Sequence, residues 1–262
     1  MTLCRRLKTL AATLALLGAA PLLKAGTWVD YRDGAAHLRG YLAGAKLQGR
    51  RPGVLIVHQW MGLTPYEEGR AEQIARQLGY VAFAADIYGV GNRPSDTKQA
   101  GEFAAKYEGD RTLYQSRVLA GLRQLAQQKN VDPHRLAVIG YCFGGAGALD
   151  MARINAPVLG VVCFHGALGT DRPAQGKIIP KILILHGADD PYVTRATVSK
   201  VETELDGAHA DYQVVLYSGT VHAFTQRSSG NDPSKGVAYN PESDRRSWRA
   251  MKDFLAELFK KG

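Results

Sequence analysis

A cysteine in a glycine-rich turn is the first residue of this sequence that could carry covalent chemistry. Cys142 lies in the segment GYCFG at 140–144, directly after the apolar run 136–139. A nucleophile with glycines two positions away on each side is typical of an elbow, where a strand turns sharply into a helix and exposes the nucleophilic side chain. The helix N-terminus favours negative charge, and therefore the thiolate. The alternative is a buried, inert cysteine.

Two later segments supply a base and a carboxylate. His222 follows the apolar run 212–217, and the pair Asp189 and Asp190 follows another such run. An imidazole can take the thiol proton near neutral pH, and a carboxylate fixes the tautomer of that imidazole. The order nucleophile, acid, histidine is that of α/β-hydrolases. We predict His222 as the general base, and the spacing H-G-x-x-D-x-x-V favours Asp190 over Asp189 as the acid.

Three further histidines, His58, His165 and His186, also follow apolar runs. They include no closely spaced ligand pair such as H-x-x-x-H, so we predict neither a metal site nor a cofactor. We expect these histidines to brace the loops in which they lie.

Alternating apolar runs and helical patterns are expected to position these residues. The order predicts the α/β class and an α/β-hydrolase fold, with a mostly parallel central sheet and helices on both faces. Turns are expected at 50–53 and 132–133. The expected strands are 28–31, 37–42, 54–58, 81–85, 136–139, 158–164, 182–185 and 212–217, and the expected helices are 67–78, 97–107, 111–128, 146–152, 196–205 and 243–259.

The first 25 residues have the pattern of a secretory signal peptide. Arg5, Arg6 and Lys8 precede the apolar run 10–20, and Leu23-Lys24-Ala25 forms a small-residue cleavage site. The apolar run is too short to span a bilayer comfortably. We therefore predict export to the periplasm or the medium, and a single domain over residues 26–262 with no membrane attachment after cleavage.

Charge and cysteine content restrict the partners. The formal net charge is +9, and removal of four basic residues with the signal peptide leaves +5. There is no run of five like charges, so a nucleic-acid partner is not expected. A modest positive charge suits a small anionic substrate. Cys142 and Cys163 are expected to be free thiols, and we expect a monomer.

At these residues the chain resembles the dienelactone hydrolase family. The resemblance implies a Cys142-Asp190-His222 triad that cleaves an ester or enol-lactone through an acyl-thioenzyme. It also implies that the backbone N–H groups of Trp60 and Phe143 hold the oxyanion. It runs from Val54 to the last helix and includes VHQWMGL at 57–63, DIYG at 86–89, the elbow, the Asp190 segment, VHAF at 221–224, YN at 239–240 and RSW at 246–248.

The chain departs from that family's pattern at the substrate pocket. Well-known members carry a glutamate that helps to deprotonate the thiol, and the matching residue is Gln59, which cannot take a proton. The arginines that hold the substrate carboxylate do not align either. Arg93 and Arg227 are nearby candidates, and each could equally be a solvated loop residue. A non-catalytic binding protein and a thiol-based redox or detoxifying protein remain alternatives.

Overall fold

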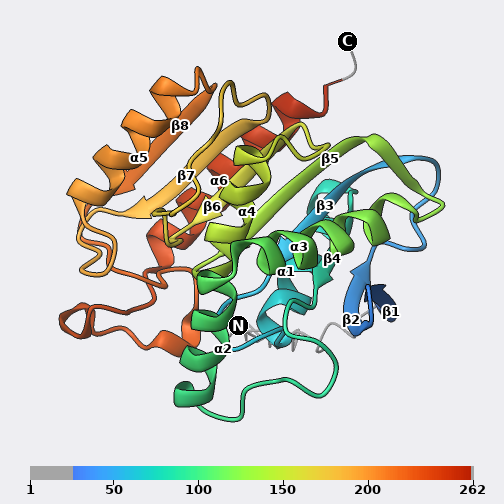
Figure 1. Ribbon diagram of the computed structural model, residues 1–262, viewed down its shortest axis with the longest axis horizontal. Coiled ribbons are helices and arrows are strands. Elements are labelled where there is room, and N and C mark those ends of the chain that lie inside the picture. The colour runs from blue at the N-terminus through green and yellow to red at the C-terminus, as the bar shows by residue number, and fades with distance from the viewer. Residues whose placement is uncertain (1–25, 261–262) are drawn as a thin grey trace, which may run out of the picture.

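The computed structural model describes residues 26–260, so the predicted signal peptide lies outside the described residues. Within this range the chain forms one mixed sheet in the order β1-β2-β4-β3-β5-β6-β7-β8 (Figure 1). The strands are β1 (Thr27–Asp33), β2 (Ala36–Ala43), β3 (Arg51–Val57), β4 (Val81–Ala85), β5 (Val131–Tyr141), β6 (Gly160–Phe164), β7 (Lys181–Gly187) and β8 (Tyr212–Tyr217). The helices are α1 (Pro65–Leu78), α2 (Thr97–Gly109), α3 (Arg111–Ala126), α4 (Phe143–Arg153), α5 (Arg195–Gly207) and α6 (Pro241–Leu258), with short 3-10 turns at Arg227–Ser229 and Pro233–Lys235.

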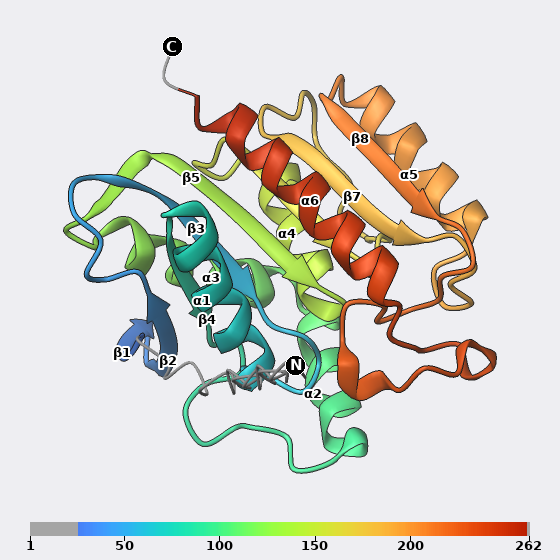
Figure 2. The ribbon, with the colours of Figure 1, turned by 180° about the vertical axis from the view of Figure 1, so that it is seen from behind.

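Helices cover both faces of the sheet. Strands β3 to β8 pair in parallel, and the hairpin β1–β2 joins β4 in antiparallel register. Parallel strands are apolar on both sides and need cover on both. Helices α2, α3, α4 and α5 lie over the face seen in Figure 1, and α1 and α6 cover the opposite face seen in Figure 2. The predicted α/β-hydrolase fold is therefore confirmed.

The register of the sheet brings distant segments to one edge. Val57 pairs with Gly140, Gly140 pairs with Cys163, and Gly187 pairs with Tyr217. The loops that follow β3, β5, β6, β7 and β8 therefore leave the sheet side by side. Ligands bind at this carboxyl edge in open parallel sheets.

Two predicted turns were wrong, and the predicted helix boundaries differ from the observed ones by up to three residues. Strand β3 already begins at Arg51, and β5 runs through Asp132 and Pro133. The reason is an irregularity in the β3–β5 ladder, where Arg51 pairs with Val131 but Gly53 pairs with Leu136. An irregular ladder accommodates proline, which has no N–H to donate.

Helix α1 starts at Pro65 rather than at residue 67. Proline is well suited to the first turn of a helix, where its missing N–H would have no partner. Among residues 26–260, none of the helices is long and apolar enough to cross a membrane.

Candidate active site

Cys142 lies on a strained turn between β5 and α4. Its backbone has φ 53° and ψ −119°, a conformation that residues other than glycine rarely adopt. Such a conformation costs about 1–3 kcal/mol and persists only where its surroundings impose it. The flanking glycines are required by space, because a Cβ on Gly140 would overlap the carbonyl of Gly144, and one on Gly144 would overlap the carbonyl of Val57. The elbow therefore presents the sulfur at the carboxyl edge of the sheet.

The imidazole of His222 lies between the sulfur and a carboxylate. Its Nε2 atom is 3.2 Å from Sγ of Cys142, and its Nδ1 donates to Oδ2 of Asp190 over 2.7 Å. The other carboxylate oxygen accepts the backbone N–H groups of Tyr192 and Val193, at 2.9 and 3.0 Å. Asp189 is exposed, whereas Asp190 is buried. The structure thus brings Asp190, and not Asp189, to the histidine.

The electrostatics of this group favour a protonated imidazole. Burial by itself would lower the pKa of His222, but hydrogen bonds to Asp190 and Cys142 and their negative charges outweigh it and raise the pKa to about 10. Burial would raise the pKa of Asp190, but its contacts with His222 and with two backbone N–H groups lower that pKa overall. A protonated imidazole at this place can donate its Nε2 proton toward the sulfur or a group bound beside it.

The predicted anion donors, the backbone N–H groups of Phe143 and Trp60, belong to segments that follow the neighbouring strands β5 and β3. Phe143 is the first residue of α4, where helical N–H groups have no partner within the helix. Trp60 lies in the loop after β3, and the hydroxyl of Tyr88 donates to its carbonyl over 2.9 Å. The hydroxyl of Tyr114 holds the carbonyl of Phe143 over 2.8 Å. Sequence reasoning missed both tyrosines, because nothing in their local sequence indicates these contacts.

Glu67 is a further residue that sequence reasoning missed. Its buried carboxylate accepts the N–H and the hydroxyl of Thr64, at 2.9 and 2.7 Å, and the N–H of Gln59 at 3.3 Å. It therefore ties the start of α1 to the loop that carries Trp60. Burial raises the pKa of Glu67. The capping-box pattern Thr64-x-x-Glu67 was the signal that could have revealed it.

Gln59 itself is buried in the same loop, and its carbonyl accepts the N–H of Gly62 at 3.0 Å. The same carbonyl accepts from Nδ1 of His58 at 2.6 Å. Gln59 thus holds the loop through its backbone.

The three remaining strand-end histidines have structural contacts. Nε2 of His58 accepts the N–H of Ile87 at 3.2 Å, and burial lowers the pKa of His58 to about 4. His165 contacts the hydroxyl of Thr225 at 2.8 Å, and His186 donates to the carbonyl of Val193 at 2.8 Å. Burial also lowers the pKa of each of these two. All three are therefore neutral near pH 7 and join neighbouring loops.

The two candidate arginines lie on different cavities. Arg93 lines a cavity of about 300 Å³ that also includes Tyr88. Arg227 lines another, of about 410 Å³, next to Arg70, and its guanidinium lies 5.2 Å from the ring centre of Tyr239. The structure does not bring the two arginines into one pocket.

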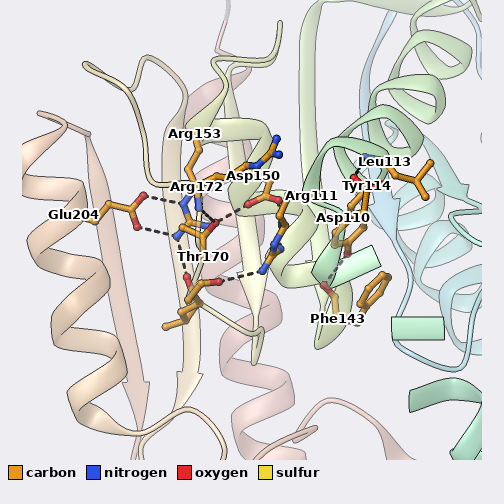
Figure 3. Close-up of polar contacts among 12 residues, drawn as sticks. Asp110, Arg111, Leu113, Tyr114, Phe143, Asp150, Arg153, Thr170, Arg172 and Glu204 are labelled. Atoms are coloured by element: carbon orange, nitrogen blue, oxygen red, sulfur yellow. Dashed lines mark hydrogen bonds and ion pairs between the residues drawn. The ribbon is translucent and has the colours of Figure 1, made fainter. Parts of the chain in front are cut away.

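A buried ion-pair network anchors helix α4 (Figure 3). Asp150 pairs with Arg111 at 3.3 Å and with Arg153 at 3.2 Å, and Arg153 also pairs with Glu204 of α5 at 2.8 Å. Arg153 and Arg111 donate to the carbonyls of residues 168 and 169 as well. The network therefore fixes the C-terminal end of α4, the helix whose first residue follows Cys142.

Cys163 differs from Cys142 in its surroundings. It is fully buried within β6, and burial raises its pKa to about 12. Both cysteines of the described range are free thiols. Cys163 is therefore an unreactive core residue at neutral pH, since the thiolate is the reactive form.

Comparison with known proteins identifies a family. The model of the dienelactone hydrolase family matches residues 38–259. The chain is 26% identical over 233 residues to a Bradyrhizobium protein named "Probable 2-oxo-3-(5-oxofuran-2-ylidene)propanoate lactonase", covering 84% of this chain and 90% of the other. Two solved structures superpose over 90% of this chain and 98% of their own. They are a protein titled m3DLH (34% identity, TM-score 0.85) and a dienelactone hydrolase-like promiscuous phosphotriesterase from metagenomic libraries (36% identity, TM-score 0.83).

Proposed function

The chain belongs to the dienelactone hydrolase family and is a hydrolase, and we propose that it cleaves a small ester or lactone through an acyl-thioenzyme on Cys142. The observation that carries this proposal is the pair of contacts made by His222, 3.2 Å to sulfur and 2.7 Å to carboxylate. They match the roles of nucleophile, base and orienting acid.

In the acylation step the Cys142 thiolate attacks the substrate carbonyl carbon. The negative charge passes to the carbonyl oxygen, where the N–H groups of Phe143 and Trp60 stabilise it. The tetrahedral intermediate collapses, the carbon–oxygen bond to the leaving group breaks, and the His222 imidazolium donates its proton to the departing alkoxide or enolate. The products of this step are the free alcohol or enol and a thioester on Cys142, with His222 neutral. In a lactone the alcohol stays attached to the acyl group.

In the deacylation step neutral His222 takes a proton from water. The resulting hydroxide attacks the thioester carbon, and the carbon–sulfur bond breaks. The acid is released, and the thiolate–imidazolium pair is restored. Asp190 remains ionised throughout, because its lowered pKa keeps it a carboxylate at neutral pH. Gln59 cannot accept a proton, so thiol ionisation relies on His222 and the end of α4.

We propose that the protein acts after export and as a monomer, and that Arg93 or Arg227 attracts an anionic substrate. The lactonase name of the Bradyrhizobium relative supports lactones as substrates to be tested, and the phosphotriesterase supports a parallel assay with phosphotriesters.

The test is hydrolysis of p-nitrophenyl acetate and of a set of enol-lactones by the full chain and two variants. Cys142→Ala is expected to lose the activity, and Cys163→Ala, which removes the buried thiol of β6, is expected to keep most of it. Equal activity in both variants would exclude Cys142 as the nucleophile. Lactone binding without turnover by the unaltered protein would support the binding-protein alternative, and a peroxide-dependent bond between the two cysteines would support the redox alternative.

A further inference from the structure

A cavity of about 300 Å³ lies between the β1–β2 hairpin and the loop that follows β4. Trp28 comes from β1, Arg39 from β2, and Val90 and Arg93 from the loop. The cavity adjoins the candidate active site through Tyr88, which lines it and whose hydroxyl also holds the carbonyl of Trp60. A substrate that reaches Cys142 could therefore extend into this space.

The walls of the cavity combine exposed apolar surface with positive charge. Trp28 is 40% exposed and Val90 is 47% exposed, both high values for large apolar side chains. The guanidinium of Arg39 lies 5.9 Å from the ring centre of Trp28, and Arg93 is exposed.

The one carboxylate of the lining, Asp86, is bound by backbone groups. It accepts the N–H of Arg39 at 3.1 Å and the N–H of Gly89 at 2.8 Å. Two arginines therefore line the cavity together with one carboxylate whose oxygens are already hydrogen-bonded. Arg39 also forms an exposed ion pair with Asp30, whose Oδ1 lies 3.9 Å from its Nε.

We propose that this cavity is a subsite for the part of the substrate remote from the scissile bond, and that it binds a planar aromatic group with an anionic substituent. The aromatic face would stack on Trp28, and the anion would meet Arg39 and Arg93. This inference rests on the proposed function. Trp28 lies outside the residues that match the family model, 38–259.

The test compares three acetate esters, vinyl acetate, 2-naphthyl acetate and 6-acetoxy-2-naphthoate, by kcat/KM. We expect the naphthoate to be preferred over the naphthyl ester by about tenfold, the effect of about 1.4 kcal/mol. Trp28→Ala should reduce the preference for both naphthyl esters over vinyl acetate, and Arg93→Gln or Arg39→Gln should remove the advantage of the carboxylate. Ile179→Ala and Arg249→Gln are matched controls, since both residues are exposed and line none of these cavity walls.

Two outcomes separate the subsite from the reaction. Hydrolysis of all three esters with ratios that Trp28→Ala leaves unchanged would overturn the subsite and leave the proposed function intact. If no ester is hydrolysed, calorimetry of 6-hydroxy-2-naphthoate binding still tests whether the cavity is a subsite. Equal affinity of the unaltered protein and Trp28→Ala would overturn the subsite.

The first described residue suggests a second, independent inference. The backbone nitrogen of Gly26 donates to Oε1 of Glu72 on α1 over 2.7 Å and to the hydroxyl of Tyr41 over 3.1 Å. That hydroxyl donates to the same carboxylate oxygen over 2.7 Å. A Cβ on residue 26 would lie 2.6 Å from the Tyr41 ring and from the carbonyl of Leu42, so only glycine fits.

We infer that signal peptidase cleaves the peptide bond between Ala25 and Gly26. We also infer that Glu72 and Tyr41 form a binding site for the new N-terminal amine. Hydrolysis by a signal peptidase would give Ala25 a carboxylate and Gly26 an amine, which takes a proton from water. The neutral N–H donor to Glu72 would become an ammonium, and charge-assisted hydrogen bonds are the stronger ones. Trp28 lies two residues later in β1, so the ion pair between the Gly26 amine and Glu72 would also hold the strand that carries Trp28.

The experiment expresses the full chain with its leader and determines the N-terminus of the exported protein by mass spectrometry. Purified full-length precursor is then melted before and after cleavage by signal peptidase. We expect an N-terminus at Gly26 and a rise in Tm of about 2–4 °C on cleavage. The rise should vanish in Glu72→Gln and persist in Glu102→Gln, an exposed control on α2. A different N-terminus, or an equal rise in Glu72→Gln, would overturn the inference.

Discussion

Nε2 of His222 lies 3.2 Å from Sγ of Cys142, although the two residues are 80 positions apart in the chain. The sulfur is held by the elbow between β5 and α4, and the imidazole by Asp190. Each side chain is fixed by its own contacts before a substrate arrives, and such preorganisation is a large part of catalytic efficiency.

This relationship predicts the reactivity of the thiol. His222→Ala removes the imidazolium beside the sulfur, so alkylation of Cys142 by iodoacetamide at pH 7 should slow by about tenfold or more. The rate is measured by mass spectrometry of the Cys142 peptide. Cys163 serves as an internal control, because it should stay unlabelled in the folded protein. Unchanged labelling of Cys142 would contradict a thiolate–imidazolium pair.

The choice of carboxylate can be tested with a matched pair of variants. Asp190→Asn leaves His222 without its anionic partner and should lower kcat by about 10²–10⁴-fold. Asp189→Asn alters the exposed neighbour and should leave kcat within about twofold, the range expected for surface changes. Steady-state kinetics with p-nitrophenyl acetate measures both. Similar losses of kcat in the two variants would show that activity depends on the loop as a whole rather than on the carboxylate of Asp190.

Glu67 should act as a positioning residue. Glu67→Gln weakens the hydrogen bonds that hold the loop of Trp60. We expect kcat to fall by about tenfold with KM nearly unchanged, because the N–H of Trp60 is proposed to stabilise the oxyanion of the transition state rather than the bound substrate. Asp96→Ala is the control, since it removes the side-chain oxygen that caps α2 by accepting the N–H of Gln99 at 2.8 Å. Both variants should lower Tm, but only Glu67→Gln should lower kcat. If both variants lose Tm and kcat in parallel, Glu67 acts only as a helix cap and does not position the loop of Trp60.

Buried His58 predicts acid sensitivity. Its pKa is about 4 when folded, against an ordinary value of 6.5, so the unfolded chain binds more protons between these values. The free energy of unfolding should therefore be unaffected by His58 above pH 6.5 and should decrease as the pH falls from 6.5 to about 4. Protonation at Nε2 would also break the bond from Ile87.

Urea unfolding at pH 7, 5.5 and 4.5 measures this dependence. His58→Gln should be less stable at pH 7 but lose less stability on acidification. His165 and His186 contribute in the same direction and remain in the variant. An identical slope in both proteins would contradict the assignment to His58.

The sequence determined the order of the elements and indicated the residues proposed to carry the chemistry. The glycines around Cys142, the apolar runs before Asp190 and His222 and the alternation of strands and helices are local patterns, and each has a local physical cause. Glycine fits the crowded elbow, and apolar runs form buried strands. The signal-peptide pattern is of the same kind and stays a prediction.

The tertiary structure alone decided which groups meet. It separated Arg93 from Arg227. It also placed Tyr88 and Glu67 at the loop of Trp60, and Tyr114 at the carbonyl of Phe143. Local sequence could not supply these results, because they depend on contacts between segments far apart in the chain. The two turn predictions were wrong for the same reason. The irregular ladder between β3 and β5 accommodates two prolines that would otherwise end a strand.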